Sequence, residues 1–359
     1  MVFYERVGVL HVHTTLSDGT AEYDELARLA NDVGVDVLLI TDHNVYAGER
    51  EGWYGNTLLL VGEELHEPAA KRAQNHLLAL GAGEELNVLV SDPQRLIDAV
   101  RQRGGLAFLA HPVEHSGAFS QEPEINWVSW EVRGFHGLEL WNYMSEFKSH
   151  LSELAPTLLY TLWPKLAIRG PYPELLHRWD GLLDRHKFVA IGGVDAHGTV
   201  YRLGPLRRAI FGYKHLFRSL TSHLLLDEDW SGDAAHDGAL VYAALRQGRA
   251  FVVYERLGSG KGFCFTAQAG REIYTLGDEF VAKGSMRLHV RVPKRARLRL
   301  LLNGHCIAET RGLELVHEAR APGVYRVEAY RRYALRERMW IVSNPIIVRT
   351  IDGTPKPGT

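Results

Sequence analysis

The chain has 359 residues, with 41 basic and 43 acidic side chains, and its 46% hydrophobic content is typical of a soluble globular protein. These values exclude a disordered chain, a coiled coil and a small disulfide scaffold, and the length suits about two domains. No apolar run reaches the ~18–20 residues of a membrane helix, and the first six residues lack the apolar stretch of a signal peptide. We therefore expect no membrane partner. The chain has only two cysteines, Cys264 and Cys306, which suits a cytoplasmic protein and excludes a cysteine-based metal site.

Charge and histidine are distributed unevenly. Residues 1–255 hold 22 basic and 34 acidic side chains, a net charge of −12, whereas residues 256–359 hold 19 and 9, a net charge of +10. Fifteen of the 18 histidines also lie in residues 1–255, close to Asp and Glu at the ends of apolar runs. The chemistry of the protein is therefore expected in this part of the chain.

Residues 1–255 repeat one pattern, in which a short apolar run is followed by a stretch with helical spacing. The runs, which are typical of buried parallel strands, are Val7–Val12, Val37–Thr41, Leu58–Gly62, Leu77–Leu80, Leu106–Ala110, Leu138–Trp141 and Phe188–Val194. The expected helices are Glu22–Val33, Pro93–Arg103, Pro173–His186 and Ala234–Gln247. Six or seven such units predict an α/β fold, either a barrel or a doubly wound sheet.

Two segments depart from this pattern. Residues 143–186 predict a helical insertion, whose aromatic side chains either cover the site or only pack against the barrel. From about Gly258 the apolar period becomes two, with Asn303-Gly304 as a hairpin signal. We therefore predict one domain at 1–255, a small antiparallel β-sandwich at 256–349, and a flexible tail at 350–359.

Imidazoles and carboxylates recur at the ends of the apolar runs. His11 and His13 are two residues apart, so in a strand both rings would project from the same face. In a parallel barrel the carboxyl ends of the strands meet at one mouth, where charged groups are rarely placed unless they are paired or bind a cation. A multinuclear metal site is therefore predicted, because similar groups lie at or near the ends of the other runs, with His76 opening one of them. They are Asp18, Asp42, His43, Glu63, Glu64, His76, His111, Asp195 and His197.

Six short blocks resemble those of the PHP (polymerase and histidinol phosphatase) superfamily of metal-dependent phosphoesterases. The blocks are His11-Val12-His13, Ser17-Asp18-Gly19, Thr41-Asp42-His43-Asn44, Gly62-Glu63-Glu64, Ala110-His111-Pro112 and Gly193-Val194-Asp195-Ala196-His197. The resemblance implies a distorted (β/α)7 barrel with two or three divalent ions at its mouth. The implied ligands are His11, His13, Asp18, His43, Glu64, His76, His111, Asp195 and His197.

The resemblance also assigns roles to neighbouring acids. Its Gly-x-Glu spacing selects Glu64 as the bridging carboxylate and leaves Glu63 structural. We interpret Asp42 as orienting a ligand imidazole, with a capping role as the alternative. Three later blocks are similar to the carbaryl hydrolase-like (CehA/McbA) branch of the superfamily: Gly248–Val252, Gly277–Glu279 and Trp340–Ile346.

The sequence contains no motif for a nucleophilic Ser or Cys and no Gly-rich nucleotide loop. We therefore expect hydrolysis by a hydroxide that bridges Zn, Mn or Fe ions, with Asp195, His197 and Glu64 as the catalytic residues. Arg202, Arg207 and Arg208 either bind a substrate phosphate or are ordinary surface residues.

The expected partner is a small-molecule ester, and a phosphoester is the first expectation. One alternative is a carboxylic ester, carbamate or amide, cleaved by the same metal-hydroxide chemistry. Another is a non-catalytic, metal-stabilised binding module. The net charge of +10 in residues 256–359 also raises nucleic-acid binding, although arginines that alternate with apolar residues are typical of any solvated strand face.

Overall fold

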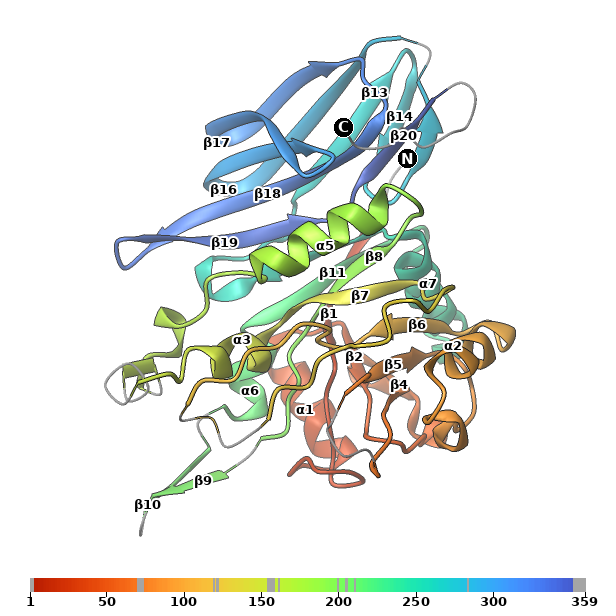
Figure 1. Ribbon diagram of the computed structural model, residues 1–359, viewed down its shortest axis with the longest axis vertical. Coiled ribbons are helices and arrows are strands. Elements are labelled where there is room, and N and C mark those ends of the chain that lie inside the picture. The colour runs from red at the N-terminus through yellow and green to blue at the C-terminus, as the bar shows by residue number, and fades with distance from the viewer. Residues whose placement is uncertain are drawn as a thin grey trace.

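The computed structural model describes residues 3–69, 74–118, 120, 123–153, 159–160, 162–198, 200–203, 206–209, 211–282 and 284–350. Within residues 200–209 it describes the backbone alone. The fold is a mixed α/β arrangement with one extended sheet (Figure 1). No helix in these residues is long and apolar enough to cross a membrane.

Seven strands of the first part follow one another as neighbours. They are β1 (Tyr4–Leu10), β2 (Val37–Ile40), β4 (Thr57–Leu65), β5 (Leu77–Leu80), β6 (Leu106–Leu109), β7 (Gly137–Asn142) and β8 (Val189–Gly193). Pairing is parallel from β1 through β2 to β4, and again from β6 through β7 to β8. Val12, beyond β1, pairs with Ala196, beyond β8, so the last strand returns to the first.

Strand β5 corrects the expectation that every apolar run forms a parallel strand. It is antiparallel to both β4 and β6. All four of its residues are buried. A strand that is buried on both faces has the same apolar pattern whether it is parallel or antiparallel to its neighbours. The pattern therefore predicts the strand but not its direction.

The four longer helices lie where the apolar spacing predicts them. They are α1 (Tyr23–Val33), α2 (Pro93–Gln102), α5 (Pro173–Leu183) and α7 (Ala234–Gln247). The Asp92 carboxylate accepts hydrogen bonds from the backbone N–H groups of Gln94 and Arg95, which caps α2. Gly34 and Gly248 end α1 and α7 in the left-handed conformation that glycine adopts most easily.

Shorter elements complete the first part. The segment 143–186 contains α3 (Tyr143–Ser149), η3 (Pro164–Leu166) and α5. Two strands, β11 (Leu220–Leu226) and β12 (Ala250–Tyr254), extend the sheet beside β1. The remaining short elements are η1 (Gly48–Arg50), β3 (Gly52–Tyr54), η2 (Asn87–Leu89), β9 (Val200–Leu203), β10 (Leu206–Ala209), α6 (Tyr213–Phe217) and η4 (Glu255–Leu257).

The C-terminal part consists of strands. They are β13 (Cys264–Ala269), β14 (Glu272–Thr275), β15 (Glu279–Val281), β16 (Met286–Leu302), β17 (His305–Ala319), β18 (Gly323–Tyr333), β19 (Arg336–Ser343) and β20 (Ile346–Arg349). Asn303 and Gly304 join β16 to β17 with φ of 49° and 79°, so the predicted hairpin turn is confirmed. These strands have their own apolar cluster, which includes Phe265 and Trp340.

The two parts are joined in two ways. Strand β12 pairs antiparallel with β19, so the C-terminal strands continue the sheet of the first part. Helix α5 lies between the C-terminal strands and β7 and β8 (Figure 1). The strands of the first part bury apolar side chains on both faces. Successive residues such as Leu38 and Leu39 point to opposite faces and belong to different apolar clusters.

Candidate metal centre

The expected ligands come together at one end of the seven strands. His11 and His13 follow β1, His43 follows β2, His111 follows β6, and Asp195 and His197 follow β8. His76 stands immediately before β5 rather than after it. Because β5 runs in the opposite direction, its beginning lies at the end where its neighbours finish. The reversal therefore places His76 with the other ligands.

His11 and His13 reach this end in a different way from the one predicted. Strand β1 stops at Leu10, and His11 has a φ of 65°. The two residues are therefore not successive same-face positions of a regular strand. Both imidazoles still point at the same carboxylate, because the Nε2 atoms of His11 and His13 lie 3.0 and 3.2 Å from Oε2 of Glu64.

Glu64 lies at the centre of the cluster and is only 1% exposed. Its Oε2 also lies 3.2 Å from Nδ1 of His43. Its Oε1 lies 2.7 Å from Nδ1 of His76 and 2.9 Å from Nε2 of His111. Burial alone would raise the pKa of Glu64, but the surrounding imidazoles hold that pKa well below its usual value. The carboxylate is ionised and faces one set of imidazoles with each oxygen.

Three groups in the cluster have ligand atoms within 4.8 Å of one another and contain all nine expected ligands. The groups are His11, His13, Glu64 and Asp195; Glu64, His76 and His111; and His13, Asp18, His43 and His197. The second group is entirely buried, and so is the first apart from Asp195, whose side chain is 14% exposed, whereas Asp18 in the third is about half exposed. A fourth group, formed by His43, His66 and His76, contains a histidine that the sequence analysis did not select.

The donors of this cluster fit divalent cations. Both ring nitrogens of His13, Nδ1 of His43, Nε2 of His76 and Nδ1 of His111 are buried without a hydrogen-bond partner. Such atoms cost free energy unless something binds them. His11, His111 and Asp195 also have φ values of 65°, 26° and 54°, a strain typical of functional sites. Imidazole nitrogen with carboxylate oxygen suits Zn, Mn and Fe.

Near the rim of the cluster, neighbouring charges shift the pKa values of the histidine and the carboxylate in opposite directions. Burial lowers the pKa of His197, but the bond to Asp18 and the charges of Asp195 and Asp18 outweigh burial and raise that pKa to about 9. Burial would raise the pKa of Asp18, but His197 and His43 lower it to about 2. The carboxylates of this region are therefore charged near neutral pH, as cation binding requires.

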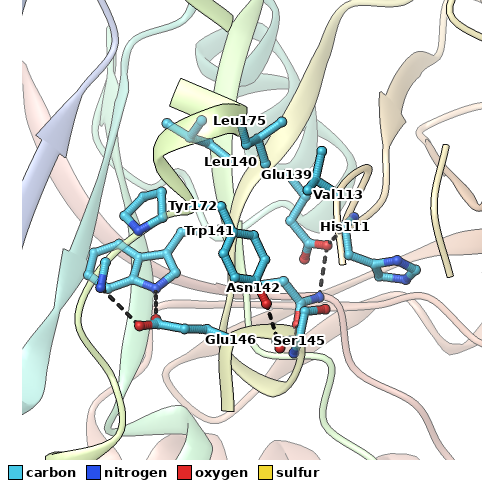
Figure 2. A pocket seen from close by; sticks show the side chains of 12 residues that line it. His111, Val113, Glu139, Leu140, Trp141, Asn142, Ser145, Glu146, Tyr172 and Leu175 are labelled. Atoms are coloured by element: carbon cyan, nitrogen blue, oxygen red, sulfur yellow. Dashed lines mark hydrogen bonds between the residues drawn. The ribbon is translucent and has the colours of Figure 1, made fainter. Parts of the chain in front are cut away.

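Glu139, on β7, is a supporting residue that the sequence analysis missed. It is fully buried, and its Oε1 lies 2.9 Å from Nδ1 of His11. Its other oxygen accepts hydrogen bonds from the backbone N–H of His111 at 2.8 Å and from the Asn142 amide at 2.9 Å (Figure 2). This carboxylate fixes the orientation of the His11 ring. The available signal was an acid inside the apolar run Leu138–Trp141.

A second buried acid, Glu114, lies beside His111 and is held by side chains of the insertion. The Oε1 atom of Glu114 lies 3.9 Å from Nδ1 of His111 and accepts a hydrogen bond from the Ser145 hydroxyl. The Oε2 atom lies 2.6 Å from Nζ of Lys148, which is also buried. Helix α3 therefore contributes to positioning this side of the cluster.

The structure corrects the interpretation of Asp42. Its carboxylate accepts hydrogen bonds from the backbone and hydroxyl of Thr14, both at 2.7 Å, and from Ser17 and Tyr23. These partners make Asp42 the anchor of the loop that carries Asp18, and not a residue that orients an imidazole. Glu63 points away from Glu64 and accepts a hydrogen bond from the backbone of Leu86, which agrees with its expected structural role.

The three arginines expected near the substrate lie on the hairpin of β9 and β10, which projects from the central strands (Figure 1). Arg207 is paired with Arg202 in the backbone register, and Arg208 is paired with Tyr201. The side chains of all three lie outside the described part of the chain. Their contact with a substrate phosphate stays a prediction.

Comparisons with known proteins give only distant similarities. No protein-family model and no curated protein matches the chain. It is similar to a two-domain protein from Bacteroides vulgatus that contains a predicted PHP-like metal-dependent phosphoesterase, with 14% identity over 96% of this chain and 95% of that chain and a TM-score of 0.43. An amidohydrolase from Chromobacterium violaceum is 14% identical over 53% of this chain and 87% of that chain, with a TM-score of 0.29.

Proposed function

We propose that the protein is a metal-dependent hydrolase of the PHP superfamily and that its first substrate class is a phosphoester. One observation carries the proposal: the two oxygens of the buried Glu64 face two different sets of imidazoles, which is the arrangement of a carboxylate that bridges two cations. We further propose that the seven strands form the distorted barrel that the motifs imply, and that residues 256–349 form a β-sandwich domain.

Each proposed ion would have its own set of residues. His11, His13, Glu64 and Asp195 would hold one ion, and Glu64, His76 and His111 would hold a second. Asp18, His43 and His197 would hold a third at the more exposed rim. When bound, divalent ions supply Lewis acidity and lower the pKa of water enough for attack near neutral pH.

The protein's own residues then have distinct tasks. Glu139 keeps the His11 ring turned toward Glu64 by holding its other nitrogen. His197 is 23% exposed at its side chain, and its Nε2 lies 3.2 Å from Oδ1 of Asp18. With only the two inner sites filled, this nitrogen is the proposed donor of a proton to the leaving oxygen; with an ion in the third site it would be a ligand instead. Oδ1 of Asp195 lies 3.4 Å from Nε2 of both His11 and His13, and this carboxylate is proposed to hold the two rings in place.

A neutral carboxylic ester, carbamate or amide is the second candidate substrate. The net charge of −12 in residues 1–255 repels an anionic phosphate until bound cations offset it, and does not oppose a neutral ester. The tail motifs that resemble the carbaryl hydrolase-like branch favour the same class. Either candidate makes a small molecule the proposed partner.

The arginines of the C-terminal strands give little support to nucleic-acid binding. Several of them face carboxylates on neighbouring strands, such as Arg287 with Glu318 and Arg311 with Glu337. These pairs reduce the positive charge available to a phosphate backbone. The cytoplasmic location also stays a proposal, which rests on the two free cysteines, Cys264 and Cys306.

The first test is the metal content per chain, measured by elemental analysis on untagged protein purified without a chelator. Two or three equivalents of Zn, Mn or Fe are expected, and near-zero content without uptake on titration would overturn the proposal. Activity is then measured on p-nitrophenyl phosphate, bis-p-nitrophenyl phosphate and p-nitrophenyl acetate, with the Asp195→Asn variant as an inactive control. A metal-loaded protein without activity on all three would instead support a metal-stabilised binding module.

A further inference from the structure

We infer that His66 creates an additional divalent-metal site at the rim of the cluster, together with His43 and His76, which binds Zn²⁺ or Co²⁺ in preference to Mn²⁺. The inference rests on the proposed function, because His43 and His76 are proposed ligands there. The inference goes beyond that function because it adds a site made only of imidazoles, which the nine expected ligands do not form without His66.

The backbone holds His66 against His43. His66 follows the end of β4, two residues beyond Glu64. Its backbone N–H donates to Oδ1 of Asn44 at 3.1 Å, and the backbone N–H of Asn44 donates to the carbonyl of Glu64 at 3.1 Å. Asn44 has a φ of 53°, a conformation that asparagine adopts more readily than most residues. The loop after β2 and the end of β4 are therefore joined at this point.

The three rings lie in close contact. The ring of His66 stacks on that of His76, with centroids 4.4 Å apart and an angle of 19° between the planes. The ring of His43 meets His66 edge-on, at 4.7 Å and 83°. One ring nitrogen from each of the three lies within 4.8 Å of the other two. This spacing suits three ligands of one ion.

Three nitrogen atoms in this group lack hydrogen-bond partners. Nδ1 of His66, Nδ1 of His43 and Nε2 of His76 are all buried without a hydrogen bond. A histidine that served only to pack against its neighbours would normally satisfy its buried nitrogen. A bound cation would remove the cost of leaving three of them unpaired.

The donors predict which ions bind. Each of the other three groups includes a carboxylate, whereas this group offers three imidazoles. Imidazole suits Zn²⁺, Co²⁺ and Cu²⁺, whereas Mn²⁺ and Mg²⁺ favour oxygen ligands. The new site also shares His43 and His76 with its neighbours, so it fills at higher free metal than they do.

The experiment is equilibrium dialysis of the metal-free full chain against rising Zn²⁺, and separately against Mn²⁺, with elemental analysis of the bound metal. Wild type is compared with His66→Gln and with His66→Phe, which keeps a ring stacked on His76 and removes the ligand nitrogen. His236→Gln is the control, because that exposed histidine at the start of α7 lies near Glu228, outside the cluster. Circular dichroism checks that all the variants fold.

Wild type and His236→Gln are expected to bind one more equivalent of Zn²⁺ at high free metal than either His66 variant, and all four proteins are expected to bind equal amounts of Mn²⁺. Equal Zn²⁺ binding by wild type and His66→Phe would overturn the inference and leave the proposed function standing. A wild type that takes up no ion at all would overturn both.

Discussion

Two regions of this protein bury many ionisable side chains, and they treat the polar atoms of those side chains in opposite ways. In the metal-ligand cluster, ring nitrogens of His13, His43, His76 and His111 have no hydrogen-bond partner. Between α5 and β18, Arg326 is 1% exposed, yet its guanidinium binds both oxygens of Asp180, at 2.7 and 2.8 Å, and Oε1 of Glu328, at 2.6 Å.

The difference separates a binding site from a structural contact. Glu328 also accepts hydrogen bonds from Arg299 and Tyr330, both through its second oxygen, so the Arg326 network is complete without any other molecule. A complete buried network holds two elements together, whereas an incomplete one indicates that a ligand is needed. Burial and charge alone do not distinguish the two cases, because both regions have them.

Two histidines show the same contrast within one residue type. His13 and His223 are both fully buried. The nitrogens of His223 lie 2.6 Å from Glu5 and 2.7 Å from Glu255, so both act as donors, as in an imidazolium. His13 makes no such hydrogen bond with either nitrogen. His223 therefore connects β1, β11 and η4, and His13 is available to a cation.

The largest expected effect comes from Glu64→Gln, which removes the charge that both sets of imidazoles share. Turnover should fall by roughly 10²-fold or more, since even residues that only support a ligand cost 10–100-fold. Saturating metal at about 1,000 times its dissociation constant should stabilise wild type by about 4 kcal/mol and the variant by far less, as measured by urea unfolding with and without chelator. Glu63→Gln is the matched control, because its carboxylate faces Leu86, and it should keep its metal-dependent stabilisation.

Breaking the complete network should affect stability and not metal binding. Arg326→Met leaves Asp180 and Glu328 without their buried partner, and should lower the free energy of unfolding by about 3–5 kcal/mol. Urea unfolding of the metal-free protein measures this loss, and elemental analysis should find wild-type metal content. A loss of metal together with stability would contradict the separation of the two regions.

Removing the support of a ligand should have an intermediate effect. Glu139→Gln keeps the shape of the side chain but weakens its hold on Nδ1 of His11, so metal affinity should fall about 10–100-fold. Competition with a chromophoric chelator measures the affinity. Unchanged affinity would show that Glu139 only fills space beside His111 and Asn142.

The smallest effect concerns pH. Burial lowers the pKa of His223, but the bonds to Glu255 and Glu5 outweigh it and raise that pKa above its usual value of 6.5. The stabilisation is therefore complete below pH 6.5 and is lost as the pH rises through the raised folded-state pKa. Unfolding free energies of metal-free wild type and His223→Gln should converge as the pH increases above 6.5. Parallel curves would indicate that His223 stays neutral.

Much of the candidate site could be predicted from the sequence, because most of its ligands follow apolar runs and neighbouring strands bring such positions together. His76 lies with the other expected ligands for a reason that the apolar pattern does not contain, the reversal of β5. Glu139 was missed because the apolar pattern around it predicts only a buried strand and gives no sign of what a single acid there would contact. His66 was missed because the motif ended at Glu64. Asp42 was misread because its hydrogen-bond partners, Thr14 and Tyr23, are distant in sequence.

The pairing of β12 with β19 affects how the chain can be divided. A fragment ending near residue 255 would expose the backbone donors and acceptors of β12 that now bond to β19. It would also remove Asn344, whose side chain binds the backbone of Ala190 and Ala250 in two neighbouring strands. An unprotected strand edge is a template for aggregation. The N-terminal part is therefore best expressed with its C-terminal strands attached, even when only its chemistry is of interest.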